Sequence, residues 1–496
     1  MTKSQLLQMF HYNEYKKQVI NSKIADGSTT TVYKCGTLVD LCLGPHVRNT
    51  GFIKAFRLLN NGASHWHVGG ISLLMDMLRK QYRLRGFSEI ITPNIYKTKL
   101  WEISGHLKHY QENMFRISTK LSQKSSDNSQ SDFESDSSQY GLKPMNCPGH
   151  CLLFKQQLYS YKDLPIRFAD FGALHRNEAS GALVGLTRVI RFQQDDAHIF
   201  CTMEQIGSEI EGCIDFLKYV YNLFGFNFDL ELSTRPESFI GTIENWNKAE
   251  KTMYIYIYHI ITRLNLEDVL NKYFGAGKWK INEGDGAFYG PKIDIHVKDA
   301  KGKSFQLATI QLDFTLPERF DLVYIDDQNI KQRPVMIHRA ILGTFERCLG
   351  VLAENYSGKW PLWLSPRQIA LLPINQTHNK LAEKILQAAL EDYPSLCIEI
   401  LPPTSSTVSA RIRTAQVLQF NLICVIGNRE LENGSVSVRG RNNSILGEFP
   451  IESFIKKVHF LASSYVKDAD LKMEEYLKNP DFGKTSLNLQ SIGNCI

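Results

Sequence analysis

Several features that would place the chain in a specialised class are missing from its sequence. The ten cysteines are scattered without the spacing of a disulfide framework. No apolar run approaches the ~18 residues that a membrane-spanning helix needs. No secretory signal is evident at the start, and residues 1–18 hold too little arginine for an organelle transit peptide. These absences favour a reducing compartment, the cytoplasm, and give no reason to expect a membrane partner.

A strong charge of either sign is missing as well. The net charge of +6 permits a polyanionic partner but does not require one. What remains is the composition of an ordinary globular protein, with 43% hydrophobic and 22% charged residues. A chain of 496 residues is long enough for about two to four domains.

The hydrophobic pattern predicts two folded domains after a small N-terminal piece, residues 1–66, which has strand-like runs at Thr30–Tyr33 and Leu38–Leu43. Residues 67–362 combine amphipathic helices with half-buried strands, which predicts an α+β domain built on an antiparallel sheet with flanking helices. Residues 363–466 alternate strand with helix, which predicts a smaller α/β domain with a largely parallel sheet.

Two segments show no sequence pattern of an ordered core. Residues 118–139 contain nine serines in 22 positions, together with acidic residues, and we expect a disordered surface loop inserted between two strands of the α+β domain. Residues 467–496 show no clear periodicity and are interpreted as a poorly ordered C-terminal tail.

Four short motifs carry most of the functional information. They are Lys143–His150, Leu174–Glu178, Gln194–His198 and His338–Arg347. The last contains a Gly-X-X-X-Arg element, and arginine forks onto phosphate and stacks on flat rings. In this order the motifs resemble those of the threonyl-tRNA synthetases, class II aminoacyl-tRNA synthetases, in their eukaryotic cytosolic form. The resemblance implies a class II catalytic domain followed by an anticodon-binding domain. It also implies a zinc-dependent, homodimeric ligase that joins threonine to tRNA(Thr) with ATP and Mg²⁺.

The resemblance implies which residues activate the amino acid. Arg176 would bridge the threonine carboxylate and the α-phosphate, Glu178 would accept from the adenine amino group, and Arg347 would pack on adenine or reach the γ-phosphate. Without the resemblance, Arg176 and Glu178 would be a surface ion pair at a strand end. The implied ATP-binding residues are Arg176, Glu178, Arg188, Phe192, Gln306, Thr309 and Arg347.

A metal site is implied by the resemblance and not by local spacing. Cys147, His198 and His338 lie far apart in sequence, and buried structural roles would be the default interpretation. In the family such residues hold one zinc, and three protein ligands leave an open coordination position. Threonine can chelate an ion with its amino and hydroxyl groups, whereas valine cannot. The implied threonine-binding residues are Met145, Gln194, Asp196 (the acceptor for the β-hydroxyl), Tyr289, Lys292 and Gln311.

The two ends of the chain carry weaker matches. Asp40, Cys42 and His46 match only half of the family's editing site, so residues 1–66 are interpreted as an editing-domain remnant that does not clear serine from mischarged tRNA. Glu430 and Arg439 match anticodon-reading positions, since such side chains suit the open edges of unstacked bases. Apart from the resemblance they would be an ordinary solvated loop pair.

Two alternatives remain open at this point. A synthetase-like protein could bind RNA without catalysis, for example as a regulator, but the presence of Arg176, Glu178 and Arg347 and of three zinc-ligand candidates speaks against it. A histidyl or prolyl relative would lack the set of one cysteine and two histidines.

Overall fold

The computed structural model separates the chain into two compact units, Met1–Ala63 and Ser64–Ile496. The structure describes residues 1–11, 17, 20–21, 24–35, 38–41, 65–117, 140–263, 279–298, 302–466, 469–480 and 482. The serine-rich segment 118–139 and the editing candidates Cys42 and His46 lie outside these residues.

The first unit combines a short helix with a β-hairpin. Helix α1 (Lys3–Met9) begins at Thr2, whose hydroxyl accepts from the Gln5 amide while the Gln5 side chain accepts from the Thr2 amide. Strands β1 (Val32–Cys35) and β2 (Leu38–Leu41) form an antiparallel pair, which confirms the two predicted strands. Asp40 lies on β2.

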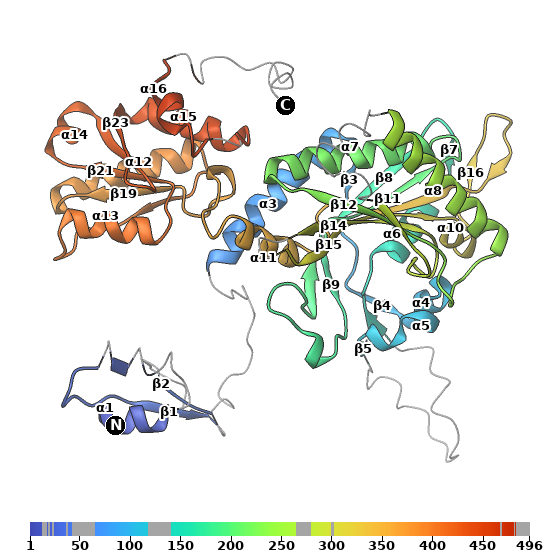
Figure 1. Cartoon of the computed structure of the whole chain (residues 1–496), viewed down its shortest axis with the longest axis horizontal. Coiled ribbons are helices and arrows are strands. Elements are labelled where there is room, and N and C mark those ends of the chain that lie inside the picture. Colours follow the sequence, from blue (N-terminus) through green and yellow to red (C-terminus); the bar gives the residue numbers. More distant parts are fainter. Residues whose placement is uncertain are drawn as a thin grey trace. The chain divides into compact units, whose positions relative to one another are not determined.

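The centre of the second unit is an eight-stranded sheet (Figure 1). Only its two end pairs, β13 with β12 and β8 with β3, are parallel, so the predicted antiparallel α+β domain is confirmed. In spatial order the strands are β13 (Trp279–Asn282), β12 (Phe228–Ser233), β14 (Lys292–Lys298), β15 (Ser304–Asp313), β18 (Val335–Ala340), β11 (Asp196–Cys201), β8 (Ile166–Asp170) and β3 (Ser88–Glu89).

Helices and small sheets surround this sheet. The helices are α3 (His65–Leu84), α4 (Thr98–Ser104), α5 (His106–His109), α6 (Cys147–Lys155), α7 (Ile206–Phe224), α8 (Ile243–Arg263), α10 (Thr315–Arg319) and α11 (Phe345–Asn355). The smaller sheets are β9 (Ala173–His175) with β10 (Arg191–Gln193); β4 (Ile95–Lys97), β6 (Tyr140–Leu142) and β5 (Arg116–Ile117); and β17 (Lys331–Gln332), β16 (Tyr324–Ile325) and β7 (Tyr159–Ser160).

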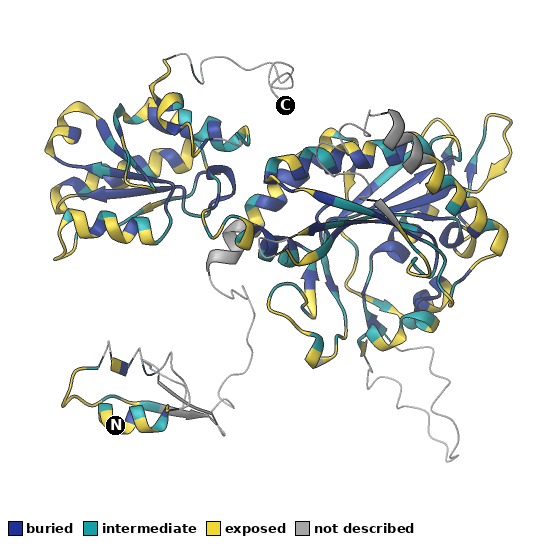
Figure 2. Cartoon of the chain, in the orientation of Figure 1, coloured by how far each residue is buried: buried dark blue, intermediate teal, exposed yellow. Residues whose placement is uncertain are grey.

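The two faces of the large sheet have different neighbours because successive side chains of a strand point to opposite sides. On β11, Ala197 and Ile199 are buried in a core with α3 and α7. Phe200 joins a separate apolar cluster with α6 and α10. Figure 2 shows that buried residues gather along the central strands, between the two helical layers. His198 of β11 and its partner His338 of β18 lie on the face that carries α6.

Residues beyond 362 form a five-stranded sheet in the order β20 (Ile398–Ile400), β19 (Ile369–Pro373), β21 (Leu422–Ile426), β22 (Ser435–Gly440) and β23 (Ile445–Pro450). The first three strands are parallel, as predicted, but β22 and β23 are antiparallel. The helices are α12 (Gln376–Asp392), α13 (Val408–Val417), α14 (Asn428–Asn433), α15 (Ile451–Ser463) and α16 (Met473–Lys478).

Helix α16 corrects one prediction. Residues 467–496 were expected to form a poorly ordered tail, and for α16 this was wrong, because Met473 and Leu477 are buried in the core of the C-terminal sheet. A helix of six residues presents only two apolar positions four apart, so no periodicity could be recognised in the sequence.

Candidate active site

One cavity on the α6 face of the large sheet gathers most of the residues that the motifs had indicated. Arg176, from the end of β9, lines it together with residues of β11, β15 and β18. The lining residues are Met145, Cys147, Leu174, Arg176, Gln194, Asp196, His198, Tyr289, Thr309, Gln311, His338 and Arg339.

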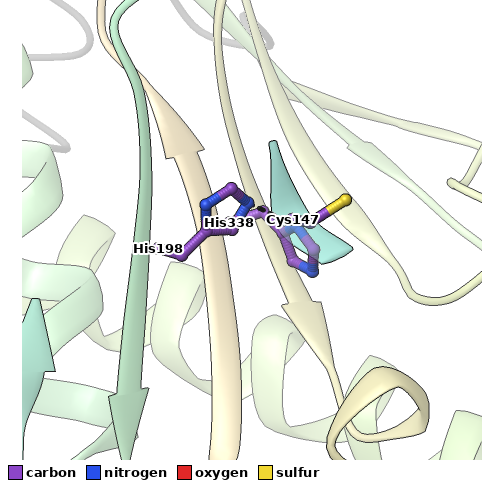
Figure 3. A group of neighbouring side chains, drawn as sticks. All are labelled: Cys147, His198 and His338. Carbon is purple, nitrogen blue, oxygen red and sulfur yellow. Dashed lines mark hydrogen bonds between the residues drawn. The ribbon is translucent and has the colours of Figure 1, made fainter. Parts of the chain in front are cut away.

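Three buried side chains on one wall form a cluster that could hold a metal ion (Figure 3). His198 and His338 are direct partners across the antiparallel pair β11–β18, and Cys147 is the first residue of α6. One ligand atom from each residue lies within 4.8 Å of the others. His198 Nε2 and His338 Nδ1 are 3.0 Å apart. Strand pairing therefore brings together residues that the sequence separates by 140 positions.

The donor set fits zinc, which binds thiolate sulfur and imidazole nitrogen. Burial raises the pKa of the Cys147 thiol, with a further contribution from the nearby carboxylate of Asp196, and burial lowers the pKa of His198. Both side chains are therefore neutral in the absence of a cation. A bound divalent cation would reverse this balance for the cysteine, because it stabilises the thiolate.

Asp196 lies beside this cluster and borders the cavity. Its Oδ2 accepts a hydrogen bond of 3.0 Å from Asn146 Nδ2, and its Oδ1 is 3.8 Å from His198 Nε2. Burial raises its pKa, with an opposing contribution from His150. Tyr289 stacks on His338, with ring centroids 4.6 Å apart, and its hydroxyl donates to Gln311 Oε1 at 2.5 Å.

Three arginines converge beside the cavity. The Arg176 guanidinium lies 4.9 Å from the centroid of the Phe192 ring. Arg188 donates two hydrogen bonds, of 3.0 and 2.8 Å, to Glu178 Oε2. Burial lowers the pKa of Arg347, and the positive charges of Arg176 and Arg188 lower it further. A cluster of three positively charged side chains is suited to a polyanion.

Arg347 is held by the turn that precedes α11. Gly343 has a φ of 64°, and a β-carbon there would collide with the carbonyl oxygen of Leu307. The Thr344 hydroxyl then accepts from the Arg347 amide at 3.3 Å and begins α11. The guanidinium donates to the carbonyl oxygens of Thr187 and Gln306, at 3.0 and 2.9 Å.

Comparison with known proteins agrees with this arrangement. The family model described as the class II core domain of tRNA synthetases for G, H, P, S and T matches residues 132–356. The second additional domain of threonyl and alanyl tRNA synthetases matches residues 30–70, and an anticodon binding domain matches residues 368–461. A cytoplasmic threonine–tRNA ligase of Caenorhabditis elegans is 45% identical over 96% of this chain and 70% of its own length. The chain belongs to the threonyl-tRNA synthetase family.

Other members of the family are similarly close. The human cytoplasmic threonine–tRNA ligase 1 is 44% identical over 94% of this chain and 69% of its own length. A crystal structure of the RNA binding domain of threonyl-tRNA synthetase from Cryptosporidium parvum has a TM-score of 0.70 and 43% identity, covering 79% of this chain and 90% of that one. No helix in the described part of this chain is long and apolar enough to cross a membrane.

Four of the residues indicated by the family motifs are engaged elsewhere. Lys292 pairs with Asp294 at 2.7 Å and Asp285 at 3.1 Å and does not line the cavity. The Gln306 side chain donates to Asp294. In the C-terminal domain, Glu430 is largely buried at the start of α14 and accepts from the Gly427 amide at 2.9 Å and from the Ser437 hydroxyl. Arg439 lies on β22 and donates to Asn443 Oδ1 at 3.4 Å.

Two histidines beside the cluster were not predicted. His106 is fully buried, with Nε2 3.2 Å from Met145 Sδ and 3.7 Å from Cys147 Sγ, and burial lowers its pKa to about 3. It precedes the serine-rich segment, so nothing in the sequence links it to Cys147. His150 follows Cys147 by three positions on α6, and that Cys-X-X-His spacing was an available signal.

Proposed function

We propose that the chain activates threonine with ATP and transfers it to tRNA(Thr), using a zinc ion to select threonine over valine. The observation that carries the proposal is that one cavity contains both the Cys147, His198 and His338 donor set and Arg176. A metal-binding wall beside a cationic wall suits a substrate that carries an amino group, a hydroxyl and a reacting carboxylate.

Selection of threonine is assigned to the metal wall. Cys147, His198 and His338 would hold the zinc ion, which would supply a Lewis acid for the amino and hydroxyl groups of threonine. Asp196, fixed by Asn146, accepts from the β-hydroxyl of threonine. Valine has no hydroxyl, so it would leave a buried acceptor unpaired, and sites of that kind reject the analogue strongly. Tyr289 and Gln311, which are hydrogen-bonded to each other, complete the wall with Met145 and Gln194.

Activation is assigned to the arginine wall. Arg176 would leave the ring of Phe192, which then receives adenine, and would bridge the carboxylate and the α-phosphate. Glu178, Arg188, Arg347, Gln306 and Thr309 contact the rest of ATP, and Mg²⁺ accompanies the nucleotide as part of the substrate. Lys292 is assigned to threonine binding, and for this it must break its ion pair with Asp294 or act through that carboxylate.

The roles of whole domains are assigned from the family models that match them, and the homodimer is assigned from exposed apolar surface. Residues 67–362 are assigned to catalysis, and residues 363–466, with Glu430 and Arg439, to the anticodon. A homodimer is supported by β3 at the edge of the large sheet and by two nearby apolar side chains, Ile91 and Leu84, which are 90% and 69% exposed. A cytoplasmic location follows the names of the relatives.

Serine is a separate problem, because it also carries an amino group and a hydroxyl. We propose that residues 1–66 do not edit, since only Asp40, Cys42 and His46 of the editing pattern are present. The synthetic site then rejects serine through one missing methyl contact, by ~10–200-fold. Rapid deacylation of seryl-tRNA(Thr), abolished by Cys42→Ala, would contradict this assignment.

The test of the synthetase activity is threonine-dependent exchange of pyrophosphate into ATP by zinc-loaded protein. Arg176→Ala should slow exchange by ~10²-fold or more, because a preorganised charge at the reacting phosphate is lost. Arg333→Ala is the matched control, since Arg333 is an exposed arginine of the same domain that contacts Asp321 and Pro317. A folded, zinc-loaded protein without exchange would overturn the enzyme assignment in favour of a non-catalytic RNA-binding protein.

A further inference from the structure

The two histidines of the metal wall have different partners behind them. His338 turns Nδ1 toward the cluster, and its Nε2 donates to Asp313 Oδ2 at 2.8 Å. The other oxygen of Asp313 accepts from the amides of Thr315 and Leu316 at 2.7 and 2.9 Å, so this carboxylate is firmly oriented. A carboxylate behind a metal-binding histidine is the common arrangement, and it fixes the tautomer and the direction of the ring.

Behind His198 there is another histidine. His198 turns Nε2 toward the cluster, and its Nδ1 lies 2.7 Å from Nδ1 of His150. Both side chains are buried, and their rings are nearly perpendicular, with centroids 4.6 Å apart. Two nitrogens at this distance share one proton, so one ring must donate and the other must accept.

The direction of that hydrogen bond follows from the metal site. A histidine that binds a metal through Nε2 must keep a lone pair there, so a neutral His198 carries its proton on Nδ1. His150 Nδ1 then accepts, and the proton of His150 lies on Nε2. This Nε2 has no hydrogen-bond partner within the described structure, and it lies 3.8 Å from Asp170 Oδ2.

Asp170 is held by several hydrogen bonds, so it places a fixed negative charge behind His150. Its Oδ2 accepts from the Thr92 hydroxyl at 2.7 Å and lies 3.4 Å from Lys143 Nζ, and its Oδ1 accepts from the Gly172 amide at 2.7 Å. Asp170 and Lys143 are both completely buried. A fixed carboxylate beyond His150 favours a proton on Nε2 of that ring over one on Nδ1.

We propose that His150 and Asp170 are positioning residues that keep the proton of His198 on Nδ1 and leave its Nε2 free to bind the metal. The inference rests on the proposed zinc site and extends it. It assigns to each histidine ligand its own supporting group, Asp313 for His338 and the pair His150–Asp170 for His198. Loss of such a partner typically lowers metal affinity by ~10–100-fold.

The test is the zinc affinity of the full-length protein, measured by competition with a chelating dye. In His150→Asn the amide oxygen can take the place of Nδ1 as acceptor, and affinity should stay within about threefold of wild type. In His150→Gln the amide reaches the place of Nε2, and in His150→Leu there is no acceptor, so both should bind zinc ~10–100-fold more weakly. His378→Leu is the matched control, because His378 is also buried but lies in the C-terminal domain, where its Nε2 is 2.8 Å from Asn428 Oδ1.

The outcomes separate the inference from the proposed function. If Cys147→Ser loses its zinc while His150→Gln and His150→Leu bind it as tightly as wild type, the inference is wrong and the metal site stands. If Cys147→Ser retains a full zinc equivalent, the metal site and the inference both fall.

A second measurement needs no variant of His150. Histidine-selective ¹⁵N labelling of the zinc-loaded wild type should show the His198 ring protonated on Nδ1 and the His150 ring protonated on Nε2. A His150 ring protonated on Nδ1 would overturn the inference even if the substituted proteins failed to fold.

Discussion

The two faces of the large sheet show how the same strands serve stability and chemistry. On β18, Ile337 points into the core formed with α3 and α7, and the next residue, His338, points into the cavity. On β11, Ala197 likewise points into this core and His198 points into the cavity. A one-residue shift of register would exchange the two sets, so the packing of the apolar face fixes the geometry of the polar one.

The largest effect is expected from a substitution that disrupts packing on the apolar face and leaves the metal ligands in place. Ile337→Ala removes a fully buried side chain and should lower the free energy of unfolding by about 2–5 kcal/mol. Urea denaturation gives this value, and metal analysis of the folded variant should still find one zinc per chain. An unchanged stability would show that this face is not the structural one.

Acid should act in opposite directions on buried groups of the two faces. His106, on the cavity side, has its pKa lowered by burial to about 3, so the stability that it contributes is present above pH ~6.5 and is lost as the pH falls toward 3. Asp195, bonded to Tyr82 on the other face, has its pKa raised by burial to about 6. Its contribution is complete below pH ~4 and is lost as the pH rises through 6.

Substitution separates these two contributions. Unfolding followed from pH 7 to pH 4 should show a weaker loss of stability in His106→Gln than in wild type. Asp195→Asn should show a stronger loss, because the group that gains stability in acid has been removed. Identical pH profiles for all three proteins would contradict the assignment of these groups.

A smaller effect is expected from a substitution in the cavity that removes the hydroxyl acceptor and keeps the metal ligands. Asp196→Ala should keep zinc bound but reduce the preference for threonine over valine by ~10²-fold, because the ligands remain and the hydroxyl acceptor is lost. Pyrophosphate exchange with each amino acid measures the ratio. Asn146→Ala, which removes the donor to Asp196, should give a partial loss.

Much of this organisation could be predicted from the sequence. Periodicity indicated amphipathic helices and half-buried strands within residues 67–362, where the structure has α3 and the pair β14–β15. It also indicated the alternation of strand with helix within residues 363–466, where the structure has β19, α12 and β20. The family resemblance implied ten of the twelve residues that line the cavity, all except Leu174 and Arg339. These signals are local, so a single sequence can display them.

What could not be predicted depends on pairing across the fold. The antiparallel pairing of β22 and β23 was not predicted, because the residues of a strand do not show which neighbour it pairs with or in which direction. Glu430 was matched to anticodon reading, yet its carboxylate caps α14, which no motif could indicate. The partnership of His150 with His198 exists only because α6 packs beside β11.

The smallest effect is expected for the serine-rich segment. Replacement of residues 122–139 by a short turn should leave both thermal stability and pyrophosphate exchange unchanged, because a polar segment with a single apolar side chain, Phe133, contributes little to a core. A marked fall in either quantity would show that the segment packs against the domain or binds a partner.

The central claim is that three residues distant in sequence form one zinc site for threonine. Metal analysis of purified wild type and of Cys147→Ser, each assayed for threonine-dependent exchange, tests it most directly. The account predicts one zinc per chain and exchange in wild type, and neither in Cys147→Ser. A full zinc equivalent and undiminished exchange in Cys147→Ser would contradict it.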